Sequence, residues 1–465
     1  IFLAFLEIWA RIINATLFKS KLTKVDTRTK FEHAFIPPFP DKNPDSLQIF
    51  IYGGSTAQGL PLSKVGFAAQ LDDQLHHIFG SQKTINVYNL GWSGYNSTMV
   101  RYLIENTIAH HPDVLVIDTG SNEFIYPQLD AYWPVKILTS LKNKSALVKL
   151  VLALKSTSTL PLADTPEPLD FKRPPYRLNP LFFNLKMWLF RRNLQAIVNL
   201  AKSHNVPLIF TTPVANLADW PPVDIKVTTL SPNAKNPAAQ FYRQAQQALA
   251  DQDYLKAQDL FIKAKDWDLI PWRTTTDQNN FIRSLADNRT IWVADTEAAF
   301  LSQAPNHLPG FALVLDNVHP SPQGSFIMAQ IILNLLSQHQ IIKPDWWASA
   351  SAPTDLNAFL NQAQFSDTDK FKIYFSTAKY SLKNPFFHLD IAQNYLNQAH
   401  AINPSDWRLP ALSATLAFLR GDITAASNLL NQAQTYRSFP VISALIKQEI
   451  PYINYFWTSV DWNSI

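Results

Sequence analysis

A serine, and a histidine with an aspartate close by, are the residues of this chain whose types and spacing could do chemistry. Ser55 follows Gly53 and Gly54 directly after a short apolar run. A serine on a tight glycine turn after a strand exposes its hydroxyl, and the flanking glycines let a substrate approach the backbone. Far downstream, Asp316 and His319 are close enough in sequence to share one turn.

These residue types fit nucleophilic catalysis. A serine hydroxyl is a poor nucleophile until a base takes its proton. A histidine can take it near neutral pH, and a carboxylate fixes the histidine tautomer. Gly-Ser turns and solvated histidines are also common in ordinary loops, so neither segment identifies a site alone.

Two further segments could donate hydrogen bonds. Gly94, in the turn Gly91-Trp92-Ser93-Gly94, could offer an unobstructed backbone N–H, and Asn122, in Gly120-Ser121-Asn122-Glu123, could offer a side-chain N–H. Together with the Ser55 amide they would form three donors around an acyl oxygen. Such donors stabilise a tetrahedral oxyanion. Taken singly, each segment also reads as an ordinary loop.

The elements that must position these residues are short apolar runs, most of them followed by glycine or polar residues. Continuous apolar strands separated by helical stretches such as 67–78 and 98–110 indicate a doubly wound, five-stranded parallel α/β sheet. Ligands of such folds sit at the carboxyl ends of the strands, where Ser55 and both donor segments fall. The predicted strands are 49–52, 87–90, 114–117, 207–210 and 291–293.

The four segments, in this order, resemble the SGNH (GDSL-like) hydrolase family, and the resemblance covers roughly residues 45–340. It implies a flavodoxin-like fold and an esterase activity. It also implies Ser55 as nucleophile, His319 as general base and Asp316 as its orienting carboxylate. Ser55, Gly94 and Asn122 would be the oxyanion donors.

The chain departs from the family at two positions. The family's first block usually has Asp before the serine, where this chain has Gly54, and its third block usually ends in Asp, where this chain has Glu123. Both variants resemble a bacterial envelope branch that also carries tetratricopeptide-like helices and an N-terminal membrane segment. They bear on the substrate more than on the chemistry.

Three other residues are candidates for binding substrate: Arg273, Glu123 and Asn216. Arg273, shortly before the last strand, could bind a carboxylate or phosphate of the substrate, or form a structural salt bridge. Asn216 follows the fourth strand and could line the pocket. No metal-ligand spacing and no phosphate-binding glycine loop stands out, so we expect no cofactor.

Two insertions and a helical region surround the predicted hydrolase domain, residues 47–345. The first insertion, 127–195, contains a basic amphipathic stretch at 135–155, either a packed helix or a lid that contacts the membrane surface. The second, 236–266, has the small/large spacing of a helical hairpin. Residues 355–438 resemble tetratricopeptide hairpins or a generic helical stack, suited to protein contacts or to packing on the catalytic domain, and 439–465 read as a tail.

The N-terminal segment 1–30 opens with an apolar run too short to span a bilayer. It is either the remainder of a membrane helix or an interfacial helix, and residues 31–46 read as a linker. Several lysines follow the run, although positive residues tend to stay on the cytoplasmic side. The resemblance nevertheless implies a membrane-anchored, extracytoplasmic (periplasmic) location in a bacterial envelope.

Composition excludes several function classes. The chain has 465 residues, no cysteine and a formal net charge of +4. Disulfides, thiolate metal sites and cysteine nucleophiles are therefore excluded, and the charge is too mild to favour nucleic acid. The resemblance implies a serine ester hydrolase or O-acyltransferase acting on a carbohydrate or lipid ester. A scaffold subunit that uses its helical repeats to bind a protein partner is the alternative.

Overall fold

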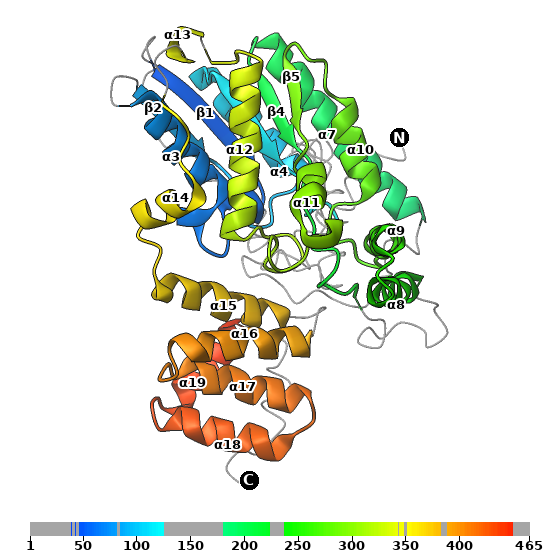
Figure 1. Ribbon diagram of the computed structural model, residues 1–465, viewed down its shortest axis with the longest axis vertical. Helices are drawn as coiled ribbons and strands as arrows, with labels where there is room; N and C mark the ends of the chain where they lie inside the picture. Colours follow the sequence, from blue (N-terminus) through cyan, green and yellow to red (C-terminus); the bar gives the residue numbers. More distant parts are fainter. Residues whose placement is uncertain are drawn as a thin grey trace, which may run out of the picture.

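A computed structural model of the chain describes residues 46–80, 84–124, 180–223, 237–342, 344–347, 351–382 and 388–449, together with Phe39 and Lys42. Its centre is one parallel sheet of five strands in the order β2-β1-β3-β4-β5 (Figure 1). This is the strand order of flavodoxin-like folds. The predicted five-stranded, doubly wound fold is therefore confirmed. The strands are β1 (Ser46–Gly53), β2 (Thr84–Asn89), β3 (Val114–Asp118), β4 (Leu208–Thr211) and β5 (Ile291–Ala294).

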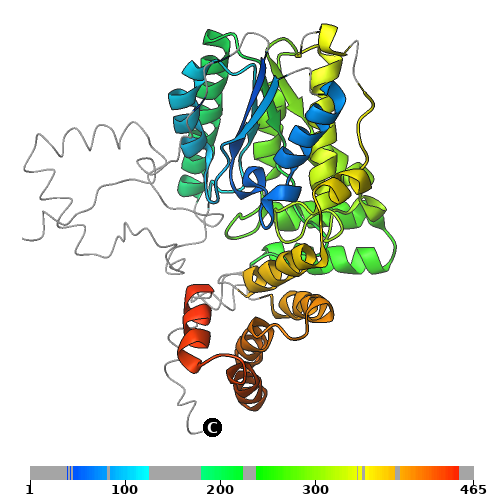
Figure 2. The same ribbon diagram turned by 90° about the vertical axis from the view of Figure 1, so that its left-hand side faces the viewer.

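Helices cover both faces of the sheet because alternate strand residues point to opposite faces. In β1, Ile49 and Ile51 belong to one apolar core, whereas Phe50 and Tyr52 belong to another. The first core includes α3, α11 and α12, and the second includes α4, α7 and α10 (Figure 2). The bounds are α3 (Phe67–Phe79), α11 (Thr296–Gln303), α12 (Pro322–Gln338), α4 (Ser97–Thr107), α7 (Pro180–Ser203) and α10 (Thr276–Ser284).

Short helical turns connect these elements. Helix α2 follows β1 directly and begins at Ser55. The others precede α3, follow α4, follow α11 and follow α12. They are α2 (Ser55–Gln58), η1 (Ser63–Val65), η2 (Ile108–His110), η5 (Pro305–His307) and α13 (Pro344–Trp347).

The second predicted insertion contains a helical hairpin of α8 (Pro237–Ala250) and α9 (Tyr254–Asp266). The rings of Tyr242 and Phe261 meet edge to face at 5.3 Å between centroids. Within the first insertion, α7 begins at Pro180, and its Phe190 and Leu194 are fully buried against the sheet. The end of that insertion is therefore part of the layer that covers the sheet.

A block of helices follows the α/β unit and has an apolar core of its own. Figure 1 shows α15 to α19 gathered against one end of the α/β unit. The sequence predicted helices only as far as residue 438, but α19 extends the block into the predicted tail. The helices are α14 (Leu356–Gln362), α15 (Asp367–Ser381), α16 (Leu389–Ile402), α17 (Arg408–Leu419), α18 (Ile423–Gln434) and α19 (Phe439–Glu449).

Several predicted segments lie outside the described residues, namely 1–30, the basic stretch 135–155 and 450–465. Of the predicted linker 31–46, the described residues contact the sheet domain: Phe39 stacks on Phe50 at 4.7 Å, and Lys42 pairs with Asp113 at 2.6 Å. No helix within the described ranges is long and apolar enough to cross a membrane.

Candidate active site

Ser55, His319 and Asp316 form one hydrogen-bonded series at the carboxyl end of the sheet. The Ser55 Oγ lies 2.7 Å from His319 Nε2, and His319 Nδ1 lies 2.6 Å from Asp316 Oδ2. Ser55 is partly exposed, whereas His319 and Asp316 are buried. The three side chains therefore have the geometry of a Ser-His-Asp triad.

The short turn from Asp316 to His319 explains their sequence spacing. Asp316 Oδ1 accepts hydrogen bonds of 2.9 Å from the backbone N–H groups of Val318 and His319. The Leu315 N–H donates to the His319 carbonyl across the same turn, at 2.7 Å. One carboxylate thus closes its own loop with one oxygen and holds the imidazole with the other.

Ser55 is positioned where β1 passes directly into α2. Ser55 is the first residue of that helix, so its backbone N–H has no partner within the helix. The Gly53 carbonyl accepts from the Trp92 N–H at 3.1 Å, which brings the 91–94 turn beside the Gly53-Gly54-Ser55 segment. Gly94 in this turn has a φ of 82°, a left-handed conformation that favours glycine.

Asn122 lies next to Gly54, the residue before Ser55. Its Nδ2 donates to the Tyr95 carbonyl at 2.9 Å, which fixes the amide and leaves its second N–H for another acceptor. A Cβ placed on Gly54 would lie 2.4 Å from this Nδ2. The structure therefore brings Ser55 and Asn122 together, with the Gly94 turn alongside, as the sequence predicted.

Glu123 does not reach the substrate side of the site, contrary to the prediction. It is buried, and its two carboxylate oxygens accept from the backbone N–H and the hydroxyl of Ser97, at 2.7 and 2.9 Å. A carboxylate at the first residue of α4 also interacts favourably with the positive end of that helix. Glu123 therefore anchors α4, and this role explains why an acid follows Asn122.

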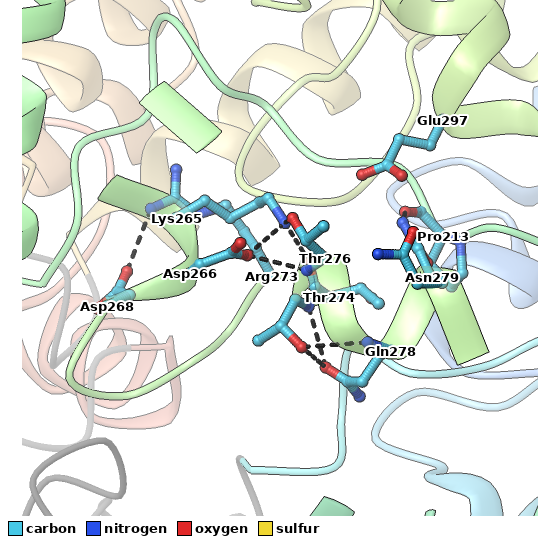
Figure 3. A network of polar contacts seen from close by, with 12 residues as sticks. Pro213, Lys265, Asp266, Asp268, Arg273, Thr274, Thr276, Gln278, Asn279 and Glu297 are labelled. Carbon is cyan, nitrogen blue, oxygen red and sulfur yellow. Dashed lines mark hydrogen bonds and ion pairs between the residues drawn. The ribbon is translucent and has the colours of Figure 1, made fainter. Parts of the chain in front are cut away.

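Arg273 is also structural, which corrects its prediction as a substrate-binding residue. It is 2% exposed, and its guanidinium donates to the carbonyls of Asn216 and Trp220 and pairs with Asp268 at 3.2 Å. Figure 3 shows Arg273 beside Asp268 within the polar network of residues 265–279. Of the two interpretations considered, the structure shows the salt bridge.

Asn216 is fully buried and lies against the turn that carries Asp316 and His319. Its Nδ2 donates to the Val314 carbonyl at 3.1 Å, and its backbone N–H donates to the Asn317 carbonyl at 3.0 Å. Both acceptors flank Asp316. Asn216 therefore holds the turn that carries Asp316 and His319, and it is not a substrate ligand.

Sequence reasoning missed three residues near the triad: Asp118, Tyr380 and Tyr395. Asp118 ends β3 and accepts a 2.6 Å hydrogen bond from the Thr211 hydroxyl. Burial raises the pKa of Asp118 to about 6, although the Thr211 hydrogen bond and the nearby His319 lower it. The two tyrosines come from the helical block, and no local sequence signal connects them to the site.

Within the described residues, no group of three or more histidines and carboxylates could hold a metal ion.

Comparisons with known proteins give fold neighbours of low similarity. No protein-family model matches this sequence, and no curated protein sequence matches it. The structure is similar to the acetyl xylan esterase AlAXEase, with 15% identity, 62% of this chain and 99% of that chain covered, and a TM-score of 0.33.

Two other solved structures give comparable values. The acetylxylan esterase Axe2 of Geobacillus stearothermophilus has 16% identity, with 65% and 96% of the two chains covered and a TM-score of 0.33. A GDSL-like lipase of Bacteroides thetaiotaomicron has 13% identity, 64% and 92% coverage and a TM-score of 0.33.

Proposed function

We propose that this chain is a serine ester hydrolase or O-acyltransferase that works through an acyl-enzyme on Ser55. The observation that carries the proposal is the hydrogen-bonded series from Ser55 Oγ through His319 to Asp316, at 2.7 and 2.6 Å. A buried carboxylate on one ring nitrogen and a serine hydroxyl on the other is the arrangement that base-assisted attack by serine needs.

The first half-reaction follows from this arrangement. His319 Nε2 takes the Ser55 hydroxyl proton while Oγ bonds to the ester carbonyl carbon, and Asp316 stabilises the imidazolium that forms. The carbonyl oxygen becomes an oxyanion, which accepts hydrogen bonds from Ser55 N–H, Gly94 N–H and the free N–H of Asn122. Collapse of this intermediate breaks the ester C–O bond, and the imidazolium returns the proton to the departing alcohol.

The second half-reaction uses the same residues. His319 takes a proton from water or from a sugar hydroxyl, and that oxygen attacks the acyl-enzyme carbonyl. Ser55 then leaves and regains its proton from His319, which releases an acid or a new ester. Hydrolysis and transfer differ only in the acceptor, so adding a short oligosaccharide to the assay and searching for its acylated form by mass spectrometry distinguishes them.

The proposed substrate is a carbohydrate or lipid ester of the bacterial envelope, and the proposed location is extracytoplasmic, with residues 1–30 at the membrane. What supports both is the resemblance of the four sequence blocks, with their departures at Gly54 and Glu123, to a bacterial envelope branch of the SGNH family. Fractionation of cells that produce the full-length protein tests the location: recovery in the cytosolic fraction would contradict it.

The activity is tested with Ser55→Ala. We expect this variant to lose both hydrolysis of short p-nitrophenyl esters and labelling by a fluorophosphonate probe, whereas Ser302→Ala, an exposed serine on α11, keeps both. Wild-type protein that neither turns over an acyl substrate nor reacts with the probe would contradict the proposal. A stoichiometric partner bound by the helical block would then favour the scaffold alternative.

A further inference from the structure

We propose that Tyr395, on helix α16 of the helical block, is a positioning residue for the triad. This inference rests on the proposed function, because it assigns to the helical block a role in that same site. The juxtaposition that carries it is one hydrogen bond: the Tyr395 hydroxyl donates to the Leu315 carbonyl at 2.8 Å. That carbonyl belongs to the peptide group that joins Leu315 to Asp316.

The α/β unit forms several hydrogen bonds to the turn from Val314 to His319. The carbonyl of the peptide group between Leu315 and Asp316 is instead bound by the helical block. Asn216 binds the carbonyls of Val314 and Asn317, on either side of it. Leu315 uses its own N–H to reach the His319 carbonyl. Within the described residues, the hydrogen bond that reaches the Leu315 carbonyl comes from Tyr395.

The surroundings of Tyr395 keep this hydrogen bond in place. The side chain is 3% exposed, and its ring meets Phe311 edge to face at 5.5 Å. Burial, together with the negative charge of Asp316, raises the pKa of Tyr395 far above its ordinary value. The hydroxyl therefore stays protonated and remains a donor throughout the working pH range.

Other contacts dock the helical block on the same edge of the site. The ring of Tyr380, on α15, meets the His319 ring edge to face at 5.9 Å between centroids. Asp369, at the start of α15, pairs with Lys64 at 2.7 Å. Ile373 and Leu315 also line one small cavity between the block and the α/β unit. The position of the block and the alignment of the triad are therefore linked.

The expected consequence concerns rate rather than binding. If the peptide group before Asp316 shifts, the carboxylate moves, and with it the imidazole that must face Ser55. Misplacing reacting groups by about 1 Å can cost about 100-fold in rate. Because Tyr395 does not touch substrate, its loss is expected to lower kcat and to leave KM nearly unchanged.

Tyr395→Phe tests this, since it removes one oxygen and keeps the ring contacts that support the fold. We expect kcat for a short p-nitrophenyl ester to fall about 10- to 100-fold, with KM within about twofold. Tyr374→Phe is the matched control. Tyr374 is partly buried, and its ring lies 6.0 Å from that of Tyr395, and this substitution should leave kcat unchanged.

A second readout does not need activity. The proton between His319 Nδ1 and Asp316 should give a far-downfield proton NMR signal, which we expect to shift or disappear in Tyr395→Phe and to persist in Tyr374→Phe. An unchanged signal together with an unchanged kcat would overturn the positioning role. If the wild type is inactive but its signal still responds to Tyr395→Phe, the proposed function fails while the positioning role stands.

Discussion

Gly54 lies against the side-chain amide of Asn122, so closely that a Cβ on Gly54 would be 2.4 Å from Asn122 Nδ2. The backbone of Gly54 has an ordinary negative φ of −85°, which any residue can adopt. Glycine is therefore required here by the approach of the amide rather than by the backbone conformation. A side chain at this position would displace one of the proposed oxyanion donors.

Gly54→Ala is predicted to lower kcat by about 10- to 100-fold, because Asn122 must move away from the oxyanion position. Steady-state kinetics on a short ester measures this. Asn122→Ala alone should cost about 100- to 1000-fold. The double variant should be no slower than Asn122→Ala, because the collision no longer exists. Additive losses, or a Gly54→Ala variant with the wild-type kcat, would show that the contact does not matter.

Asp118→Asn is predicted to change how stability depends on pH. The folded-state pKa of Asp118, about 6, exceeds the ordinary value of 3.8, because burial disfavours the charged carboxylate. The folded state therefore holds the proton more tightly, and the resulting stability is present at low pH and is lost as pH rises through about 4 to about 6. The difference corresponds to about 3 kcal/mol in the free energy of unfolding.

Urea unfolding at a series of pH values measures this. The wild type should lose stability relative to Asp118→Asn as pH rises towards neutrality. Asp251→Asn, at an exposed carboxylate on the surface, should follow the wild type. Parallel curves for wild type and Asp118→Asn would refute the raised pKa.

Arg273→Met is predicted to destabilise the fold without changing KM for a short ester. Removing the guanidinium leaves Asp268 buried without its cation, which costs about 3–5 kcal/mol. Arg283→Met is the matched control. Arg283 pairs with Asp295 and Glu297 but is 31% exposed, so its loss should cost about 1 kcal/mol or less. A raised KM in a folded Arg273 variant would restore the substrate-binding role.

Much of the fold and the centre of the site could be predicted because both leave local signals. Uninterrupted apolar strands indicate a buried parallel sheet, and the parallel arrangement brings Ser55 and Asn122 to one edge. The close spacing of Asp316 and His319 predicts one shared turn, and the structure shows that turn closed by the carboxylate itself.

The outer part of the site could not be predicted, because its residues act through tertiary contacts. Arg273 and Asn216 were predicted to bind substrate, because their sequence positions do not reveal that each donates to backbone carbonyls. Tyr395 reaches Leu315 across a domain boundary. The sequence pattern of α16 does not indicate that the Tyr395 hydroxyl donates a hydrogen bond to the Leu315 carbonyl.

The most direct measurement of the central claim is the site of covalent modification. The full-length protein is treated with a fluorophosphonate, digested, and its peptides are analysed by tandem mass spectrometry. We predict one adduct, on Ser55, which disappears in both Ser55→Ala and His319→Ala. An adduct on another serine, or hydrolysis of esters by Ser55→Ala at the wild-type rate, would contradict the assignment of Ser55 as the nucleophile.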